Sequence, residues 1–397
     1  MQEAILGVLR RVAVIGVGMT RFGKLEDRSL MDLLAEASIK AMKDAGVDYE
    51  EFDSVYVGNM LGSVVERQTA IATALVDRLS LFPAAAETVE NGPAAGASAV
   101  KNGFQAVASG LADLVLVVGG EKMTSLDTAT LTDYIATMTH PEAEYMHGAT
   151  LASLAALLMK LYEQRYGVTE EHVAMVAVKN HRNALKNPYA HLRREITLEE
   201  ALQSKMVAEP LRMYYSCPIS DGAAAAILCP LEKAGKYTDK PVEIKGIGHA
   251  TDYQTLHERE DPAVLKSCKY AAEQAYRMAG LSPKGIDVAE LHDAFSILEI
   301  VESEDVGFFK KGQGHLAVEQ GVTELDGVLP INPSGGLKAR GHPVGATGVA
   351  QVVELVWQLR GEAGERQISK NAKRGLACNF GGFGNNTLVH ILEAIRK

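Results

Sequence analysis

Two histidines and one cysteine stand out because each lies where an apolar strand gives way to a polar or glycine-rich segment. His292 lies in ELHDAF, His342 in NPSGGLKARGHPVGATG and Cys378 in LACNFGGFG. Imidazole can donate a hydrogen bond or shuttle a proton near neutral pH, and glycines allow close approach of the backbone. In open α/β sheets, ligands bind at the carboxyl ends of the strands. We therefore expect these three side chains to converge on one site.

The elements that would position these residues occur twice along the chain. An apolar strand running into a Gly-x-Gly turn appears at residues 12–18 and again at residues 242–248. Each copy is followed by an amphipathic helix that ends at a glycine, Gly46 or Gly280, which is a helix C-cap signal. Another strand follows each helix at the same spacing. The sequence therefore predicts two similar halves.

Strands that alternate with helices indicate an α/β fold, with parallel sheets covered by helices on both faces. In the first half we expect strands at residues 12–18, 54–58, 114–118 and 223–228, and helices at about residues 30–45 and 94–109. In the second half we expect strands at residues 242–248 and 288–292, with a helix ending near residue 279.

The central part of the chain has no counterpart in the second half. It contains many Met, Tyr and His residues and several charged helices. We predict an inserted lobe at residues 121–215, a first half at 1–120 that is completed by 216–235, and a second half at 236–397. Long insertions often shape a binding site, although this one could also be a purely structural excursion.

Composition excludes several classes of protein. The net charge of −10, without a block of Lys and Arg, argues against a nucleic-acid partner. The four cysteines show neither CxxC pairing nor zinc spacing, as expected for reduced thiols in a cytoplasmic protein. The first residues lack a signal-peptide layout, and no segment approaches the ~18 apolar residues of a membrane span. We expect a cytoplasmic protein without a membrane partner.

Several segments together resemble the thiolase superfamily. Residues 332–348 are very similar to the thiolase signature around the catalytic His of a Gly-His-Pro motif, and HDAF at 292–295 resembles the family's His-Asp-x-Phe motif. GGEKMT at 119–124 and SDGAAA at 220–225 resemble two further family segments. The resemblance covers essentially the whole chain. It leans toward acetyl-CoA acetyltransferases and sterol-carrier-protein-type thiolases, in the archaeal and multicomponent branch.

This resemblance implies a thiolase fold, in which duplicated βαβαβαββ halves form five αβαβα layers with an inserted loop lobe. It also implies a coenzyme A thioester as substrate, no bound cofactor or metal, and a homodimer or larger assembly. Members of that branch associate with a small zinc-ribbon/OB-fold subunit. A Claisen-type reaction forms an enolate, so donors must face the thioester oxygen, and His292 and His342 match these positions. Further pocket positions implied by the resemblance are Asn332, Ser334, Gly381 and His147.

Cys378 is similar to the family's second cysteine, which acts as an acid or base. The family pattern is Cys-x-Gly, whereas Asn379 and Phe380 stand between Cys378 and Gly381. The alternative is a buried structural thiol.

The position of the family's nucleophilic cysteine falls on Pro93, in the segment VENGPAAG. Proline has no thiol, so no acyl-enzyme can form there. It also lacks the backbone N–H that serves as an oxyanion donor, and loss of one such donor costs about 10²–10³ in rate. By sequence, Cys217 and Cys229 flank the strand that returns from the lobe, and Cys268 lies in a helix. None of them is expected to substitute.

Three functions remain open at this stage. The first is acyl transfer, by thiolysis of a 3-ketoacyl-CoA or its reverse. The second is retro-aldol cleavage of an acyl-CoA, which needs an enolate but no acyl-enzyme. The third is a non-catalytic acyl-CoA-binding paralogue that supports a partner subunit. Four basic residues could meet the coenzyme A phosphates or simply form a solvated face: Arg193, Arg194, Lys205 and Arg212.

Overall fold

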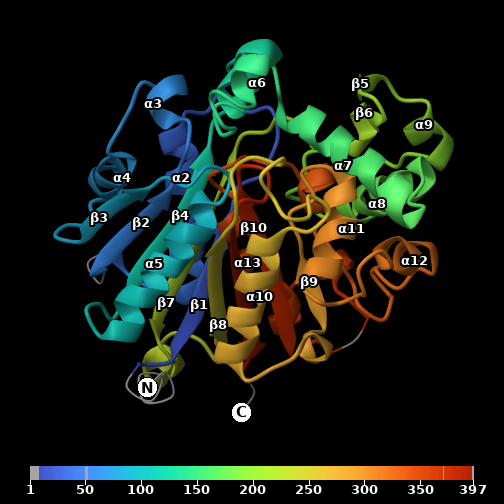
Figure 1. Cartoon of the computed structure of the whole chain (residues 1–397). Coiled ribbons are helices and arrows are strands. Elements are labelled where there is room, and N and C mark those ends of the chain that lie inside the picture. The colour runs from blue at the N-terminus through green and yellow to red at the C-terminus, as the bar shows by residue number, and fades with distance from the viewer. Residues whose placement is uncertain (1–8, 50–51, 370, 396–397) are drawn as a thin grey trace.

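The computed structural model describes residues 9–49, 52–369 and 371–395. Its centre is a nine-stranded sheet in the order β3-β2-β4-β7-β1-β8-β11-β10-β9 (Figure 1). The strands are β1 (Val12–Met19), β2 (Ser54–Gly58), β3 (Ala85–Val89), β4 (Val115–Glu121), β7 (Gly222–Pro230), β8 (Val242–Thr251), β9 (Val288–Glu290), β10 (Arg374–Gly381) and β11 (Asn386–Ala394).

The two ends of this sheet repeat one pairing pattern. In the first half β1 pairs antiparallel with β7, β7 antiparallel with β4, and β4 parallel with β2. In the second half β8 pairs antiparallel with β11, β11 antiparallel with β10, and β10 parallel with β9. A short antiparallel ladder between β1 and β8 joins them. The predicted duplication is confirmed.

Helices pack against this sheet at corresponding places in the two halves. Helix α2 (Leu30–Ala45) contacts β1 and β7, and α10 (Lys266–Ala279) contacts β8 and β11. Helices α5 (Ala95–Ser109) and α13 (Thr347–Arg360) contact each other as well as strands of the sheet. Nearly every residue of α13 is buried. The α/β fold predicted from the sequence is confirmed, but the expectation of parallel sheets is wrong. Among the described residues, five of the eight strand pairs of the nine-stranded sheet are antiparallel, because the last strand of each half returns between its neighbours.

The repeated Gly-x-Gly turns have a packing explanation. A Cβ added at Gly18 would lie 2.5 Å from the backbone nitrogen of Ala41 on α2. A Cβ added at Gly248 would lie 3.0 Å from Cα of Ala271 on α10. Only glycine therefore lets each helix lie this close to the first strand of its half.

The sequence did not predict everything at the first end of the sheet. Strand β3 and helices α3 (Gly62–Val65) and α4 (Ile71–Leu79) had not been expected. Strand β3 is the terminal strand there, while β4 lies between β2 and β7. Residues 115–121 therefore lie inside the sheet, and the edge available on this half is β3.

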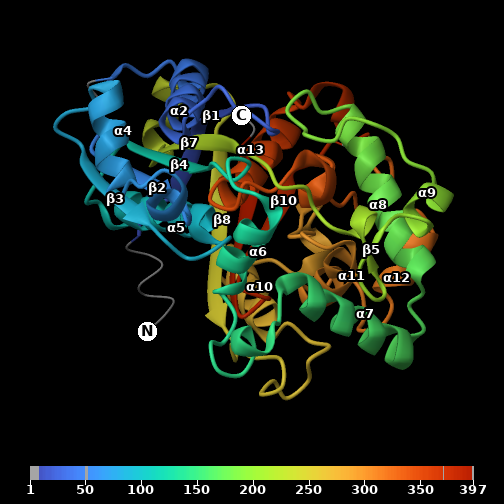
Figure 2. The ribbon, with the colours of Figure 1, turned by 90° about the horizontal axis from the view of Figure 1, so that it is seen from above.

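The inserted lobe is mainly helical (Figure 2, green). Its helices are α6 (Thr128–Ala136), α7 (Leu151–Tyr166), α8 (Glu170–Leu185) and α9 (Leu198–Leu202), and β5 (Met206–Ala208) and β6 (Leu211–Arg212) form a two-stranded ladder. Helices α7 and α8 lie along the second half, against α11 (Ser296–Asp305), and α8 also contacts α12 (Gly314–Glu319). The domain limits at 120, 215 and 236 stay a prediction. In the described part of the chain no helix has the length and apolar character needed to cross a bilayer.

Candidate active site

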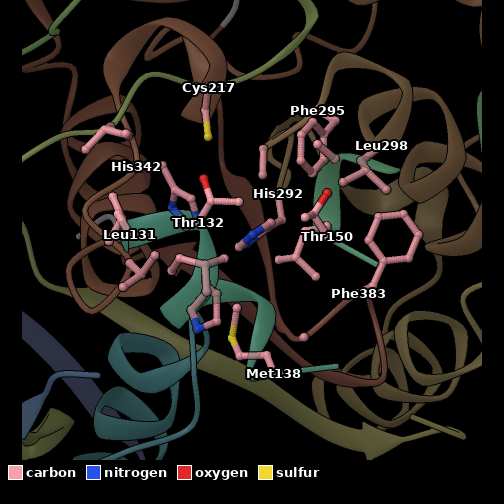
Figure 3. A pocket seen from close by; sticks show the side chains of 18 of the residues that line it. Leu131, Thr132, Met138, Thr150, Cys217, His292, Phe295, Leu298, His342 and Phe383 are labelled. Carbon is pink, nitrogen blue, oxygen red and sulfur yellow. The ribbon is translucent and has the colours of Figure 1, made fainter. Parts of the chain in front are cut away.

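A cavity of about 170 Å³ opens where both halves and the lobe meet (Figure 3). The two halves contribute polar groups and close backbone, while α6 and the start of α7 contribute an apolar wall. Its lining includes Pro93, Met123, Leu131, Thr132, Met138, Thr150, Cys217, His292, Phe295, His342, Phe380 and Phe383. It lies at the carboxyl ends of β9 and β10, as expected for a ligand site in such a sheet.

His292 lies just after β9 and is 1% exposed. Its Nδ1 accepts a hydrogen bond from Nδ2 of Asn379 at 2.8 Å and a longer one from the backbone N–H of Phe380 at 3.4 Å. A backbone N–H can only donate, so the proton of the neutral ring is on Nε2. Nε2 makes no hydrogen bond within the described part of the chain. His292 therefore presents a donor to the cavity.

His342 precedes α13 and is 7% exposed. Its Nδ1 lies 2.6 Å from Oγ1 of Thr347, and that hydroxyl donates to the carbonyl of Pro343 at 3.1 Å. The hydroxyl has a single proton, which it donates to Pro343, so Oγ1 must accept a hydrogen bond from Nδ1–H of His342. Nε2 of the imidazole therefore carries the lone pair. No other hydrogen bond of this ring is found among the described residues. His342 therefore presents an acceptor to the cavity.

The two imidazoles meet edge to face, with ring centroids 5.0 Å apart and planes at 85°. Burial lowers the pKa of His342 to about 3, and the nearby Arg340 guanidinium acts in the same direction. Burial also lowers the pKa of His292 well below its usual value, with His342 and Arg340 adding to the effect. Both rings are thus neutral at physiological pH, one as a donor and one as an acceptor.

Cys378 does not line the cavity. The residue is fully buried, and its Sγ lies 3.5 Å from Sγ of Cys268 on α10. Burial, and then the neighbouring Cys268, raise the pKa of its thiol well above the ordinary value. The position against His292 is taken by Phe380, whose ring centroid lies 4.1 Å from the imidazole. Phe380 and Gly382 are separated by one residue, as are the cysteine and glycine of the family's Cys-x-Gly pattern, and both line the cavity. Phe380 then stands where the pattern has its cysteine.

Pro93 lines the cavity immediately before α5. The turn that carries it is held by a hydrogen bond of 3.0 Å from the N–H of Ala94 to the carbonyl of Asn91. Gly92 has φ +53°, in the left-handed region that favours glycine. The sulfur-containing residues that line the cavity are Met123, Met138 and Cys217, whereas position 93 contributes no sulfur.

Three residues predicted for the pocket instead support it from behind. Asn332 is fully buried; its Nδ2 donates to Glu299 at 2.7 Å and its Oδ1 accepts from the N–H of Leu291 at 2.8 Å. Ser334 is also buried and donates to Glu290 at 2.7 Å. Gly381 allows β10 to approach the turn before Pro93, since an added Cβ would lie 2.8 Å from the carbonyl oxygen of Asn91. These three residues are absent from the cavity lining.

His147 also lies elsewhere. It is exposed in a 3₁₀ turn (Tyr145–His147), whereas the lobe reaches the cavity through α6 and through residues 150–152. Of the four basic residues considered for phosphates, Arg212 forms an ion pair with Glu170 and Arg194 lies over the ring of Tyr214. None of the four lines the cavity.

Sequence reasoning missed several contributors to the site. Cys217 seemed to flank a strand, yet its backbone N–H donates to the carbonyl of Ala294 at 2.9 Å, which brings its side chain into the cavity wall. No role was predicted for Asn379 and Phe380, because the neighbouring Cys378 was expected at the site. Thr347 lies in the same segment as the Gly-His-Pro motif, and its short separation from His342 could have indicated a contact between the two side chains. No role was predicted for it.

Comparison with known proteins agrees with the fold. A family model described as the thiolase N-terminal domain matches residues 12–232, and one described as thiolase C-terminal domain-like matches residues 248–394. The chain belongs to the thiolase family, and the predicted thiolase fold and enzyme class are confirmed.

Three similar proteins illustrate the range of this family. An acetyl-CoA acetyltransferase of Methanothermobacter thermautotrophicus is 47% identical over 97% of this chain and 100% of its own length. Sterol carrier protein 2 of Bos taurus is 38% identical over 94% of this chain and 70% of its own length. The solved structure of the Ltp2-ChsH2(DUF35) aldolase superposes with a TM-score of 0.83 at 25% identity, covering 98% of this chain and 99% of that one.

Proposed function

We propose that this enzyme makes or breaks a carbon–carbon bond beside the thioester carbonyl of an acyl-CoA, through an enolate and without an acyl-enzyme at position 93. The observation that carries this proposal is the pair of neutral imidazoles, one donor and one acceptor, that share a cavity with Pro93. The acetyl-CoA acetyltransferase relative supports an acyl-CoA as the substrate.

The two imidazoles divide the chemistry between them. Nε2–H of His292 donates to the thioester oxygen, where negative charge develops as the enolate forms, and such donors are worth about 10²–10³ in rate. Nε2 of His342 takes a proton from the substrate or from an attacking thiol. The apolar wall excludes water, which strengthens both interactions.

Two reactions share this enolate. In thiolysis the thiol of coenzyme A attacks a 3-ketoacyl-CoA directly, and in aldol cleavage a 3-hydroxyacyl-CoA loses its hydroxyl proton. Acyl transfer is supported by the names of the relatives, as with the acetyl-CoA acetyltransferase. Aldol cleavage is supported by Pro93 and Phe380, which put no thiol at either of two cavity positions, and by likeness to the Ltp2-ChsH2(DUF35) aldolase.

Assembly is a further part of the proposal. The outer edge of β3 has no strand partner within the described residues, so a second copy could extend the sheet there and form a homodimer. The sequence resemblance implied association with a small zinc-ribbon/OB-fold subunit. The similar Ltp2-ChsH2(DUF35) aldolase has a second component in its name, which supports such an association.

Mass spectrometry and product analysis test this proposal together. The enzyme would be incubated with acetoacetyl-CoA plus coenzyme A, and separately with a 3-hydroxyacyl-CoA, with and without a co-expressed small subunit. We expect product to form without a covalent adduct on the enzyme. Turnover of acetoacetyl-CoA identifies acyl transfer, and turnover of the 3-hydroxyacyl-CoA identifies aldol cleavage. An acyl adduct on any cysteine contradicts the proposed mechanism. Binding of acyl-CoA without turnover of either substrate would leave the non-catalytic role.

A further inference from the structure

All four cysteines lie in the described residues, and of these Cys217 alone lines the cavity, although sequence alone gave no reason to assign it a role. The segment before β7 is joined to the segment after β9 by the N–H of Cys217 to the carbonyl of Ala294 at 2.9 Å and by a bridge between Ser216 and Phe295. The wall that carries the thiol is therefore tied to the wall that carries His292. Figure 3 shows the Cys217 sulfur pointing into the cavity on the side of His342.

A cationic group stands behind this thiol. Lys338 is 1% exposed, and its charge favours ionisation of Cys217. Its Nζ lies 3.4 Å from Nε2 of His181, whose Nδ1 lies 2.9 Å from the carbonyl oxygen of Arg194. A carbonyl can only accept, so Nδ1 of His181 carries the proton and Nε2 accepts from the Lys338 ammonium. Burial lowers the pKa of Lys338 to about 8, while Cys217 and Asp293 favour its charged form, so Lys338 remains mostly a cation at neutral pH.

We infer that Cys217 is the proton donor to the α-carbon of the enolate formed in this cavity. The inference rests on the proposed function and adds its second proton transfer. When the carbon–carbon bond breaks, its electron pair remains on the α-carbon as the enolate. The Cys217 S–H bond then breaks as the new C–H bond forms, and the thiolate left behind is stabilised by Lys338. The proton that His342 removed at the start restores the thiol, so the enzyme ends in its initial state.

The electrostatics agree with an acid rather than a nucleophile. Burial raises the pKa of Cys217 to about 12, and Asp293 raises it further while Lys338 opposes both. The thiol is therefore protonated at neutral pH, and a nucleophile would have to be a thiolate. An enolate beside a thioester is a far stronger base than a thiolate, so transfer from sulfur to carbon is downhill.

Deuterium uptake at the α-carbon tests this role. Cleavage in D₂O, and exchange of the α-hydrogens of acetyl-CoA, would be followed by NMR for the wild type, Cys217→Ala and Cys217→Ser. We expect exchange to fall about 10²-fold in both variants, since general acid catalysis contributes at least that much. Affinity for coenzyme A should be unchanged. Serine fills the same space with a much weaker acid, so it separates acidity from packing.

Controls keep the outcomes distinct. Cys229→Ala removes a buried thiol on β7 that lies outside the cavity, and it should exchange as the wild type does. Wild-type rates in Cys217→Ser would overturn the acid role alone. An acyl adduct on Cys217 would overturn it too, by making the residue a nucleophile. Absence of both exchange and turnover in the wild type, with every acyl-CoA tried, would overturn the proposed function and this inference together.

Discussion

The hydroxyl of Thr347 lies 2.6 Å from Nδ1 of His342, in the first turn of the helix that follows it. This contact places the imidazole proton on Nδ1 and leaves the lone pair of Nε2 for the cavity. Thr347 does not touch the cavity itself, so it is a positioning residue for the base.

Thr347→Val should lower kcat about tenfold or more, because general-base catalysis contributes about 10²–10⁴ and the base would lose its fixed tautomer. Thr347→Ser restores the hydroxyl and should restore most of the rate. KM should change little in either variant. If Val and Ser variants lose activity equally, the hydroxyl does not orient His342.

Replacing His292 tests the donor to the thioester oxygen. His292→Ala should lower kcat about 10²–10³-fold, the usual cost of one oxyanion donor, while the protein stays folded. Steady-state kinetics and circular dichroism would measure both. His257→Asn provides the matched control, since His257 is exposed and outside the cavity, and it should keep the wild-type rate. Retention of full activity in His292→Ala would remove His292 from the mechanism.

The protonation states of the two imidazoles are directly measurable. Burial disfavours the charged ring, so the pKa of His342 falls to about 3 and that of His292 falls well below its usual value. Both rings should therefore stay neutral as the pH is lowered from about 8 to about 5, where an ordinary histidine of pKa ~6.5 becomes charged. Ring-proton NMR shifts assigned by single substitution would show this. A transition near 6.5 for either ring would contradict it.

A cysteine introduced at position 93 tests the role of this part of the cavity wall. Pro93→Cys adds both a nucleophile and a backbone N–H at the cavity wall, so acetyl-CoA should leave an acetyl adduct on residue 93 that intact-protein mass spectrometry detects. Pro93→Ala restores the N–H alone and should show no adduct. A stable Pro93→Cys protein without an adduct would mean that this wall does not reach the thioester carbonyl.

Asp221 anchors the return of the chain from the lobe to the core. It is fully buried and accepts hydrogen bonds from Lys122 at 2.6 Å and from the N–H groups of Met123 and Thr124 at 2.7 and 2.8 Å. Burial would raise its pKa, but the donors Lys122 and Thr124 hold it below the ordinary value.

Asp221→Asn should destabilise the fold by about 3–5 kcal/mol, since it leaves Lys122 buried without a charged partner. Urea unfolding would measure this. Asp113→Asn is the matched control, because Asp113 pairs with Arg10 and Lys233 at half exposure and should cost below about 1 kcal/mol. Equal losses in the two variants would contradict the argument.

Much of the fold could be predicted because its signals are local. Strand β2 begins and ends where the sequence predicted, and α2 and α5 agree to within a residue. Apolar runs, helical periodicity and glycine C-caps depend on neighbours in the chain. Strand β3 was missed because its burial is weak and its place depends on pairing with β2.

The cavity was predicted only in part. His292 and His342 were found because the segments around them are long and specific, and the structure brings them together. Cys378 was preferred to Phe380 because a thiol suggests chemistry and a phenyl ring does not. Both residues lie in the regular β10 ladder, and only the tertiary contacts show that Phe380 meets His292 while Cys378 meets Cys268 on α10.

The sequence by itself determined the duplicated α/β architecture, the family resemblance and the absence of a thiol at Pro93. Only the tertiary structure decided which side chains share the cavity and which nitrogen of each imidazole faces it. The reason is physical: these outcomes depend on contacts between segments far apart in the chain, such as Cys217 with Ala294 and His292 with Asn379. Such contacts leave no periodic pattern in the sequence.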